Sequence, residues 1–135
     1  MSQRPARSLR VLVVEGHPDA AESTAQLLSL LGHEASAARS AAEARAAVAA
    51  GFVPDLVFLD VLLPDGDGYT LAAELCRLLA VRPALVAVTG LPDQEERSRA
   101  ARFDHHYLKP LNPGVLATLL KGYADRLAAG DESRE

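Results

Sequence analysis

Short, mostly apolar runs alternate with longer amphipathic stretches along this chain of 135 residues. Apolar runs of this length, rich in branched residues, are typical of strands that are buried on both faces of a parallel sheet. The pattern predicts five strands, of which the second is the weakest: residues 9–14, 34–38, 55–60, 84–89 and 105–108.

The stretches between these runs carry apolar residues at helical spacing, which predicts helices at 18–31, 40–51, 67–80, 92–102 and 112–127. Ser40 and Glu43 have the spacing of a capping box, and Asn112 before Pro113 is a favourable helix start. Gly32 stands where a helix end often adopts a left-handed conformation. Regular alternation of strands and helices predicts a parallel sheet with helices on both faces.

Composition narrows the class of protein. The length suits one domain, which we expect at residues 9–129, between polar tails at 1–8 and 130–135. A net charge of −4 argues against binding to nucleic acid, and no apolar stretch approaches the roughly 20 residues of a membrane span. The single cysteine, Cys76, lies in an apolar helical stretch, where we interpret it as a core residue. One cysteine cannot form an internal disulfide, which suits the cytoplasm.

Polar residues stand at the ends of four predicted strands. They are Glu15, Asp60, Thr89 and Lys109. Each has an ordinary explanation when it is taken alone, as a helix cap, a turn residue or a solvated charge. The carboxyl ends of parallel strands share one edge of the sheet, where ligands usually bind. The sequence therefore predicts one candidate site that combines carboxylates, a hydroxyl and a cation.

The motifs around these residues resemble the receiver domain of two-component response regulators over residues 9–127. The resemblance is carried by Leu59-Asp60 followed by Pro64 and Asp67-Gly68, by Val88-Thr89-Gly90, by Lys109-Pro110 and by Val13-Val14-Glu15. Two further segments are most similar to receivers of hybrid histidine kinases: Gly32-His33-Glu34 and Phe103-Asp104-His105-His106. The resemblance implies a flavodoxin-like (βα)5 fold, in three layers, with strand order 2-1-3-4-5.

The same resemblance implies a function and assigns roles. Asp60 would accept a phosphoryl group from a histidine kinase or histidine phosphotransfer protein, assisted by Thr89 and Lys109. Mg²⁺ would be held by Glu15, by Asp60 and by the backbone carbonyl of Leu62. The family also implies a cis bond between Lys109 and Pro110. We expect a signalling module that contacts a downstream protein, without nucleic acid or membrane as partner, and not an enzyme.

The metal site departs from the family pattern. Receivers normally carry two adjacent acids after the first strand, but here Glu15 is followed by Gly16, which has no side-chain ligand. We therefore expect weakened binding of Mg²⁺. His17 is nearby, but imidazole is a poor ligand for Mg²⁺, and an exposed turn residue is the simpler interpretation.

The output segment departs as well. The stretch between Thr89 and Lys109 is about two residues shorter than usual, and it lacks the Ala-Gly pair that normally precedes the fifth strand. We expect the fourth helix or its following loop to be short or reshaped. His106 occupies the position of the switch residue, which moves together with Thr89 in the family. A half-buried strand residue remains the alternative for His106.

Two other functions stay open. Gly16 and the shortened segment suit a pseudo-receiver, an interaction module that phosphorylation does not switch. The intact set of Asp60, Thr89 and Lys109 favours a working phosphoacceptor instead. A small-molecule enzyme is the weakest alternative, because the residues after the first strand form neither a dinucleotide-binding nor a Walker sequence.

Overall fold

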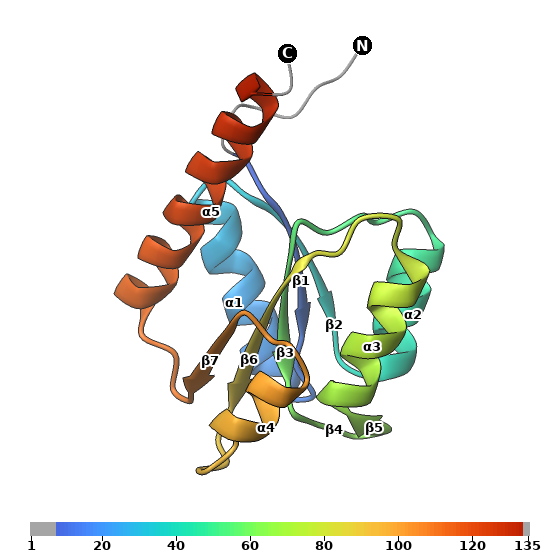
Figure 1. Ribbon diagram of the computed structural model, residues 1–135. Coiled ribbons are helices and arrows are strands. Elements are labelled where there is room, and N and C mark those ends of the chain that lie inside the picture. Colours follow the sequence, from blue (N-terminus) through green and yellow to red (C-terminus); the bar gives the residue numbers. More distant parts are fainter. Residues whose placement is uncertain (1–7, 134–135) are drawn as a thin grey trace.

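A parallel sheet of five strands lies between two layers of helices (Figure 1). The computed structural model describes residues 8–133. The order in the sheet is β2-β1-β3-β6-β7, which is the predicted order 2-1-3-4-5 when the five long strands are counted along the chain. The strands are β1 (Arg10–Val14), β2 (Glu34–Ala38), β3 (Leu56–Asp60), β6 (Ala84–Thr89) and β7 (His105–Leu108).

The helices divide the core into two halves. They are α1 (Pro18–Leu30), α2 (Ala41–Ala49), α3 (Gly68–Leu78), α4 (Glu95–Ala100) and α5 (Pro113–Ser133). On one face of the sheet, α1 and α5 cover Val11, Val13 and Phe58; on the other, α2 and α3 cover Leu12 and Val57. Every residue of β3 is buried, as its apolar sequence predicts for a central strand.

Capping side chains fix the starts of two helices at the predicted residues. The Ser40 hydroxyl accepts a hydrogen bond from the Glu43 N–H, as the predicted capping box requires. The Glu43 carboxylate accepts from the Arg39 N–H, one residue before the cap, rather than from that of Ser40. Asn112 accepts from the backbone of Gly114 and Val115 at the start of α5. Gly32 has the left-handed conformation expected after α1, with φ of 92°.

Two apolar residues at helix ends, Leu31 and Leu78, are exposed although their helices carry apolar residues at helical spacing. The reason is that α1 and α3 end beside them. At Leu79 the chain becomes extended, and this residue packs against the core in place of Leu78. Cys76 is half-buried and packs against the same core, in agreement with its interpretation.

Two segments are arranged differently from the prediction. A hairpin of two short strands, β4 (Leu62–Leu63) and β5 (Gly66–Asp67), precedes α3. Helix α4 spans six residues rather than 92–102, because Asp93 and Arg102 adopt positive φ angles that interrupt a helix on either side.

The structure also shows how the two ends of the described part of the chain are arranged. Ser8 belongs to the fold, because its buried hydroxyl donates a hydrogen bond to the Gly32 carbonyl. Helix α5 extends to Ser133, beyond the predicted end at Leu127, and Ala128 and Ala129 favour this continuation. The remaining tail positions, 1–7 and 134–135, lie outside the described residues. Within the described part, no helix combines the length and the apolar character that a membrane crossing requires.

Candidate functional site

Three ionisable side chains meet where β1, β3 and β7 end. The ammonium Nζ of Lys109 donates a hydrogen bond to Asp60 Oδ2 at 2.9 Å, and it also donates to Glu15 Oε1. Both carboxylates are buried, with 9% of each residue exposed. The structure therefore brings together Glu15, Asp60 and Lys109, which are separated by up to 94 positions in the sequence.

Backbone contacts hold the Asp60 carboxylate on its other side. The Leu62 N–H donates to Asp60 Oδ1 at 3.2 Å. Gly68 lies against the strand end so closely that a Cβ atom there would stand 2.3 Å from the Asp60 carbonyl oxygen. Its N–H donates to the Val61 carbonyl at 2.8 Å. The glycine thus permits an approach between α3 and the Asp60 backbone that no other residue type allows.

Burial and charge act on the three groups in different directions. Burial raises the pKa of Asp60, the neighbouring Glu15 charge raises it further, and the hydrogen bond from Lys109 only partly offsets this. Burial alone would raise the pKa of Glu15, but the hydrogen bonds from Lys109 and from the His17 N–H outweigh it, so this pKa lies below its usual range. Burial disfavours the charged form of Lys109, but its two carboxylate partners raise its pKa overall. The arrangement places a buried Asp60 carboxylate beside a fixed cation.

Thr89 lies next to this cluster at the end of β6. It is 1% exposed, and its hydroxyl accepts a hydrogen bond from the Leu91 N–H at 3.1 Å. The Thr89 carbonyl accepts from the Lys109 N–H at 2.8 Å, so the backbone of β6 fixes the lysine from which the ammonium extends. The bond between Lys109 and Pro110 is cis, as the family resemblance implies.

Two carboxylates are available for a metal. Within residues 8–133, no group of three His, Cys, Asp or Glu side chains is placed to hold a metal ion. Mg²⁺ can bind through one or two carboxylates while it keeps several waters, so Glu15 and Asp60 with the Leu62 carbonyl fit such a site. Gly16 adds no ligand, and a Cβ atom there would stand 3.0 Å from Pro64 Cδ. His17 is exposed, as expected for a turn residue.

The predicted switch residue is held by partners that sequence reasoning missed. His106 is half-buried, and its Nδ1 atom lies 2.8 Å from the hydroxyl of Ser98 on α4. The same hydroxyl lies 3.2 Å from the Tyr69 hydroxyl at the start of α3. The only signal in the sequence was Ser98 itself, a small polar residue inside a helix of charged residues, and that pattern does not name its contacts.

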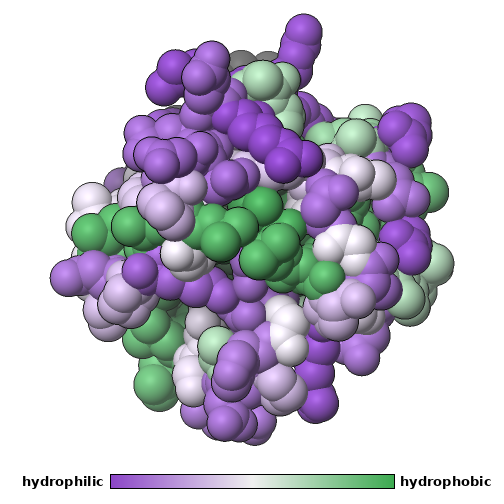
Figure 2. Space-filling model, turned by 90° about the horizontal axis from the view of Figure 1, so that it is seen from below, coloured by the Kyte–Doolittle hydropathy of each residue, from purple (hydrophilic) through white to green (hydrophobic). Residues whose placement is uncertain are grey.

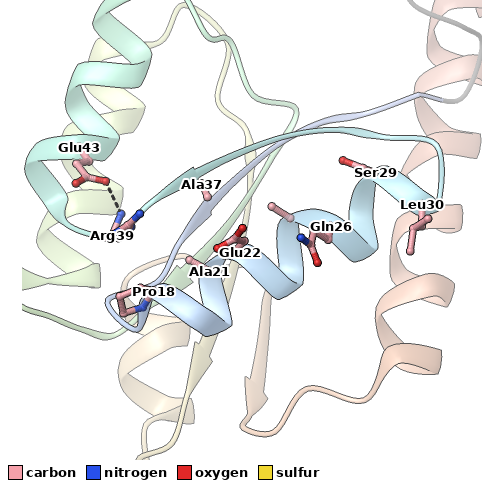
Figure 3. Close-up of a pocket in the computed structure, with 10 residues that line it drawn as sticks. Pro18, Ala21, Glu22, Gln26, Ser29, Leu30, Ala37, Arg39 and Glu43 are labelled. Atoms are coloured by element: carbon pink, nitrogen blue, oxygen red, sulfur yellow. Dashed lines mark hydrogen bonds between the residues drawn. The ribbon is translucent and has the colours of Figure 1, made fainter.

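Two hollows lie near this part of the molecule. One hollow, of about 540 Å³, is bounded by Glu15, Asp60 and Lys109, by α1 and by the loop after β7. A groove of about 970 Å³ runs along α1, Ala37 of β2, Arg39 and the start of α2 (Figure 3). This groove is lined by none of the four strand-end residues, whereas Glu15, Asp60 and Lys109 line the first hollow.

Apolar side chains are exposed around the carboxyl edge of the sheet, where the strands end. Seen from the side where the strands end, the surface carries a hydrophobic band between polar regions (Figure 2). Among the exposed large apolar residues, Leu62, Leu91 and Leu108 belong to segments at this edge. A surface of this kind suits contact with another protein.

Comparison with known proteins identifies the family. A sequence model of the response regulator receiver domain matches residues 11–121. The chain belongs to this family. A similar curated protein is the sensor histidine kinase RcsC of Escherichia coli, 28% identical over 126 residues; the match covers 93% of the chain and 13% of RcsC. The chain therefore spans a small part of that relative.

Solved receiver structures agree with the fold. A CheY-like receiver domain from Methanospirillum hungatei superposes with a TM-score of 0.78 at 29% identity, covering 88% of this chain and 95% of the other. The response regulator TrrA from Thermotoga maritima, solved in complex with Mg²⁺-BeF, gives a TM-score of 0.74 at 24% identity and covers 85% and 98% of the two chains. The flavodoxin-like fold and the receiver family predicted from the sequence are both confirmed.

Proposed function

We propose that this receiver accepts a phosphoryl group on Asp60 from a histidine kinase or a histidine phosphotransfer protein. The observation that supports the proposal most directly is the Asp60 carboxylate, held between Lys109 Nζ and the Leu62 N–H at the carboxyl edge of the sheet. Receiver domains act generally as signalling domains, and this proposal assigns no turnover of a separate substrate.

In the proposed reaction, an oxygen of ionised Asp60 attacks the phosphorus of a phosphohistidine. The bond between phosphorus and the imidazole nitrogen breaks, the imidazole leaves with the electron pair, and an acyl phosphate forms on Asp60. Phosphoryl transfer depends chiefly on positioning and on neutralisation of charge on the phosphoryl oxygens. Lys109 would turn its ammonium from the two carboxylates to one of these oxygens, and the Thr89 hydroxyl would donate to another.

We further propose that Mg²⁺ accompanies the reaction, as the metal named with the Thermotoga receiver. When bound, it would neutralise charge on the transferred group. Glu15, Asp60 and the Leu62 carbonyl would hold it, with water in the position that an acid at residue 16 fills in other receivers. Because only two carboxylates remain and both already contact Lys109, we expect weaker binding than a third carboxylate would give.

The alternative is an interaction module that phosphate does not switch. Gly16 favours it, and so does the closed set of contacts among Glu15, Asp60 and Lys109, which satisfies the three charges without a ligand. Under either proposal the partner is a protein, which contacts either the carboxyl edge of the sheet or the surface formed by α4, β7 and α5. We place the domain in the cytoplasm, where histidine kinases carry their phosphohistidine.

One experiment separates these two functions. The protein is incubated with acetyl phosphate at increasing Mg²⁺ concentrations, and its intact mass is measured. A single phosphate adduct that is absent from Asp60→Asn but present in the exposed-site control Asp19→Asn supports phosphoacceptor function. No adduct at high Mg²⁺, together with no transfer from a phosphorylated kinase, would show that the interaction module is the better description.

A further inference from the structure

Three side chains from three separate elements form a line of hydrogen bonds beside the site. Tyr69 begins α3, Ser98 lies on α4, and His106 lies on β7. The Ser98 hydroxyl is 3.2 Å from the Tyr69 hydroxyl and 2.8 Å from His106 Nδ1. Ser98 is 1% exposed, so water has almost no access to it. Such a buried hydroxyl is costly to leave without partners, and its position is therefore defined by these two contacts.

The direction of each hydrogen bond follows from the donors available. The Tyr69 hydroxyl has one proton, and the Gln94 side-chain oxygen, 3.1 Å away, can only accept it. The Ser98 proton is then required for the Tyr69 oxygen, and His106 must donate from Nδ1 to the Ser98 oxygen. Every contact in the line is satisfied only in this sense. The geometry thus places a proton on His106 Nδ1.

The line also connects two parts of the proposed mechanism. Tyr69 directly follows Gly68, which packs against the Asp60 carbonyl. The Tyr69 ring is braced by an edge contact with Phe103 and by the Arg97 guanidinium above its face. Helix α4 has only six residues, so its own hydrogen bonds give it little independent stability. Its placement depends on contacts such as those of Ser98.

We propose that Ser98 is a positioning residue of the switch: it binds Tyr69 and His106 together and so holds α4 and β7 in the resting arrangement. This inference rests on the proposed function, because it takes His106 as the switch residue. Any inward turn of His106 must break its bond to Ser98. By thermodynamic linkage, an interaction present only in the resting state opposes phosphorylation, and its loss favours phosphorylation by the same factor.

The first test reads the His106 tautomer by ¹⁵N NMR at a pH well above the usual histidine pKa of about 6.5. His106 signals are identified by their loss in His106→Phe. We expect the Nδ1–H tautomer in the wild type. In Tyr69→Phe, Ser98 loses the phenol oxygen as acceptor and donates to His106 Nδ1 instead, so the proton should move to Nε2. Tyr123→Phe, which removes the partner of His105, is the matched control and should leave His106 unchanged.

The second test measures phosphorylation of Ser98→Ala by acetyl phosphate. The variant loses one net hydrogen bond from the resting state. The equilibrium ratio of phosphorylated to unphosphorylated protein should therefore rise by about fivefold. Ser98→Thr keeps the hydroxyl and should restore values near the wild type. Glu96→Ala, on the exposed side of α4, is the control for effects of helix sequence alone.

The outcomes distinguish a failure of this inference from a failure of the proposed function on which it rests. A wild type that accepts phosphate while Ser98→Ala behaves identically overturns this inference and leaves the proposed function intact. An Nε2–H tautomer in the wild type, or an unchanged tautomer in Tyr69→Phe, also overturns it. A wild type that accepts no phosphate under any condition overturns both.

Discussion

The Lys109 ammonium lies 2.9 Å from Asp60 Oδ2 and also contacts the carboxylate of Glu15. One cation therefore serves two buried acids whose pKa values move apart, with that of Asp60 raised and that of Glu15 lowered. Burial outweighs the effect of the lysine on Asp60, so a further cation beside this carboxylate would stabilise its ionised form.

Removal of the cation should slow the proposed reaction. We expect Lys109→Met to lower the rate of phosphorylation by acetyl phosphate by about tenfold or more. The reason is that the ammonium no longer stabilises the charge that develops on the phosphoryl oxygens. The rate is measured by intact mass against time. Lys121→Met, which removes a lysine from an exposed pair with Asp125, is the control. Equal rates for both variants and the wild type would show that Lys109 has no part in the transfer.

A carboxylate at residue 16 should strengthen metal binding. We expect Gly16→Asp to lower the dissociation constant for Mg²⁺ by about tenfold, since a third acid joins Glu15 and Asp60. Isothermal titration calorimetry measures the change. Gly16→Ala introduces the same Cβ atom, 3.0 Å from Pro64 Cδ, without the charge. Identical affinities for Gly16→Asp and Gly16→Ala would contradict the assigned ligand set.

The opposite pKa shifts predict opposite effects of pH on stability. The pKa of Asp60 is raised on folding, so its ionisation costs stability as pH rises above the usual range of an aspartate. Asp60→Asn should therefore be more stable than the wild type at pH 7, by an amount of the order of 1 kcal/mol. That advantage should shrink as the pH falls toward 4. Urea denaturation at several pH values measures it, and a pH-independent difference would contradict the interpretation.

Glu15 should show the reverse dependence. Its pKa is lowered on folding, so its contribution is present above its unfolded pKa and is lost as pH falls through the lower, folded value. Glu15→Gln should destabilise the protein at pH 7, again by about 1 kcal/mol, and the loss should be smaller in acid. Comparison of the two variants in one pH series is a direct check, because the two slopes must have opposite signs.

The close approach at Gly68 should be intolerant of any side chain. A Cβ atom 2.3 Å from the Asp60 carbonyl oxygen forces α3 away from β3, and we expect Gly68→Ala to cost about 2–3 kcal/mol of unfolding free energy. Gly122→Ala is the matched control: it lies in helix α5 with open space around it, and alanine there should stabilise by somewhat under about 1 kcal/mol. If both substitutions were neutral, the packing at Gly68 would not be as described.

The sequence predicted the elements that strong local patterns encode. The apolar runs placed all five long strands, and the family resemblance gave their order. The strand-end positions of Glu15, Asp60 and Lys109 correctly indicated one edge of the sheet. Ser40 and Glu43 defined a helix start because capping depends on residues three apart.

Local patterns failed where distant contacts or unusual backbone decide. Helix α4 is shortened by Asp93 and Arg102 in left-handed conformations, and neither is a glycine that would indicate this. The hydrogen bonds of Ser98 join it to residues 29 positions before it and 8 positions after it, so no periodicity could reveal them. The division of Lys109 between two acids likewise depends on distances that only the folded chain defines.

Helix α5 begins at the carboxyl edge of the sheet and runs back to the opposite end, where β1 also starts (Figure 1). Anything attached by peptide bond beyond either described end therefore departs from the side remote from Asp60. A phosphodonor would approach the other end of the sheet, where Asp60 lies. The domain can therefore be immobilised or fused through either end for binding measurements while the edge that carries Asp60 stays accessible.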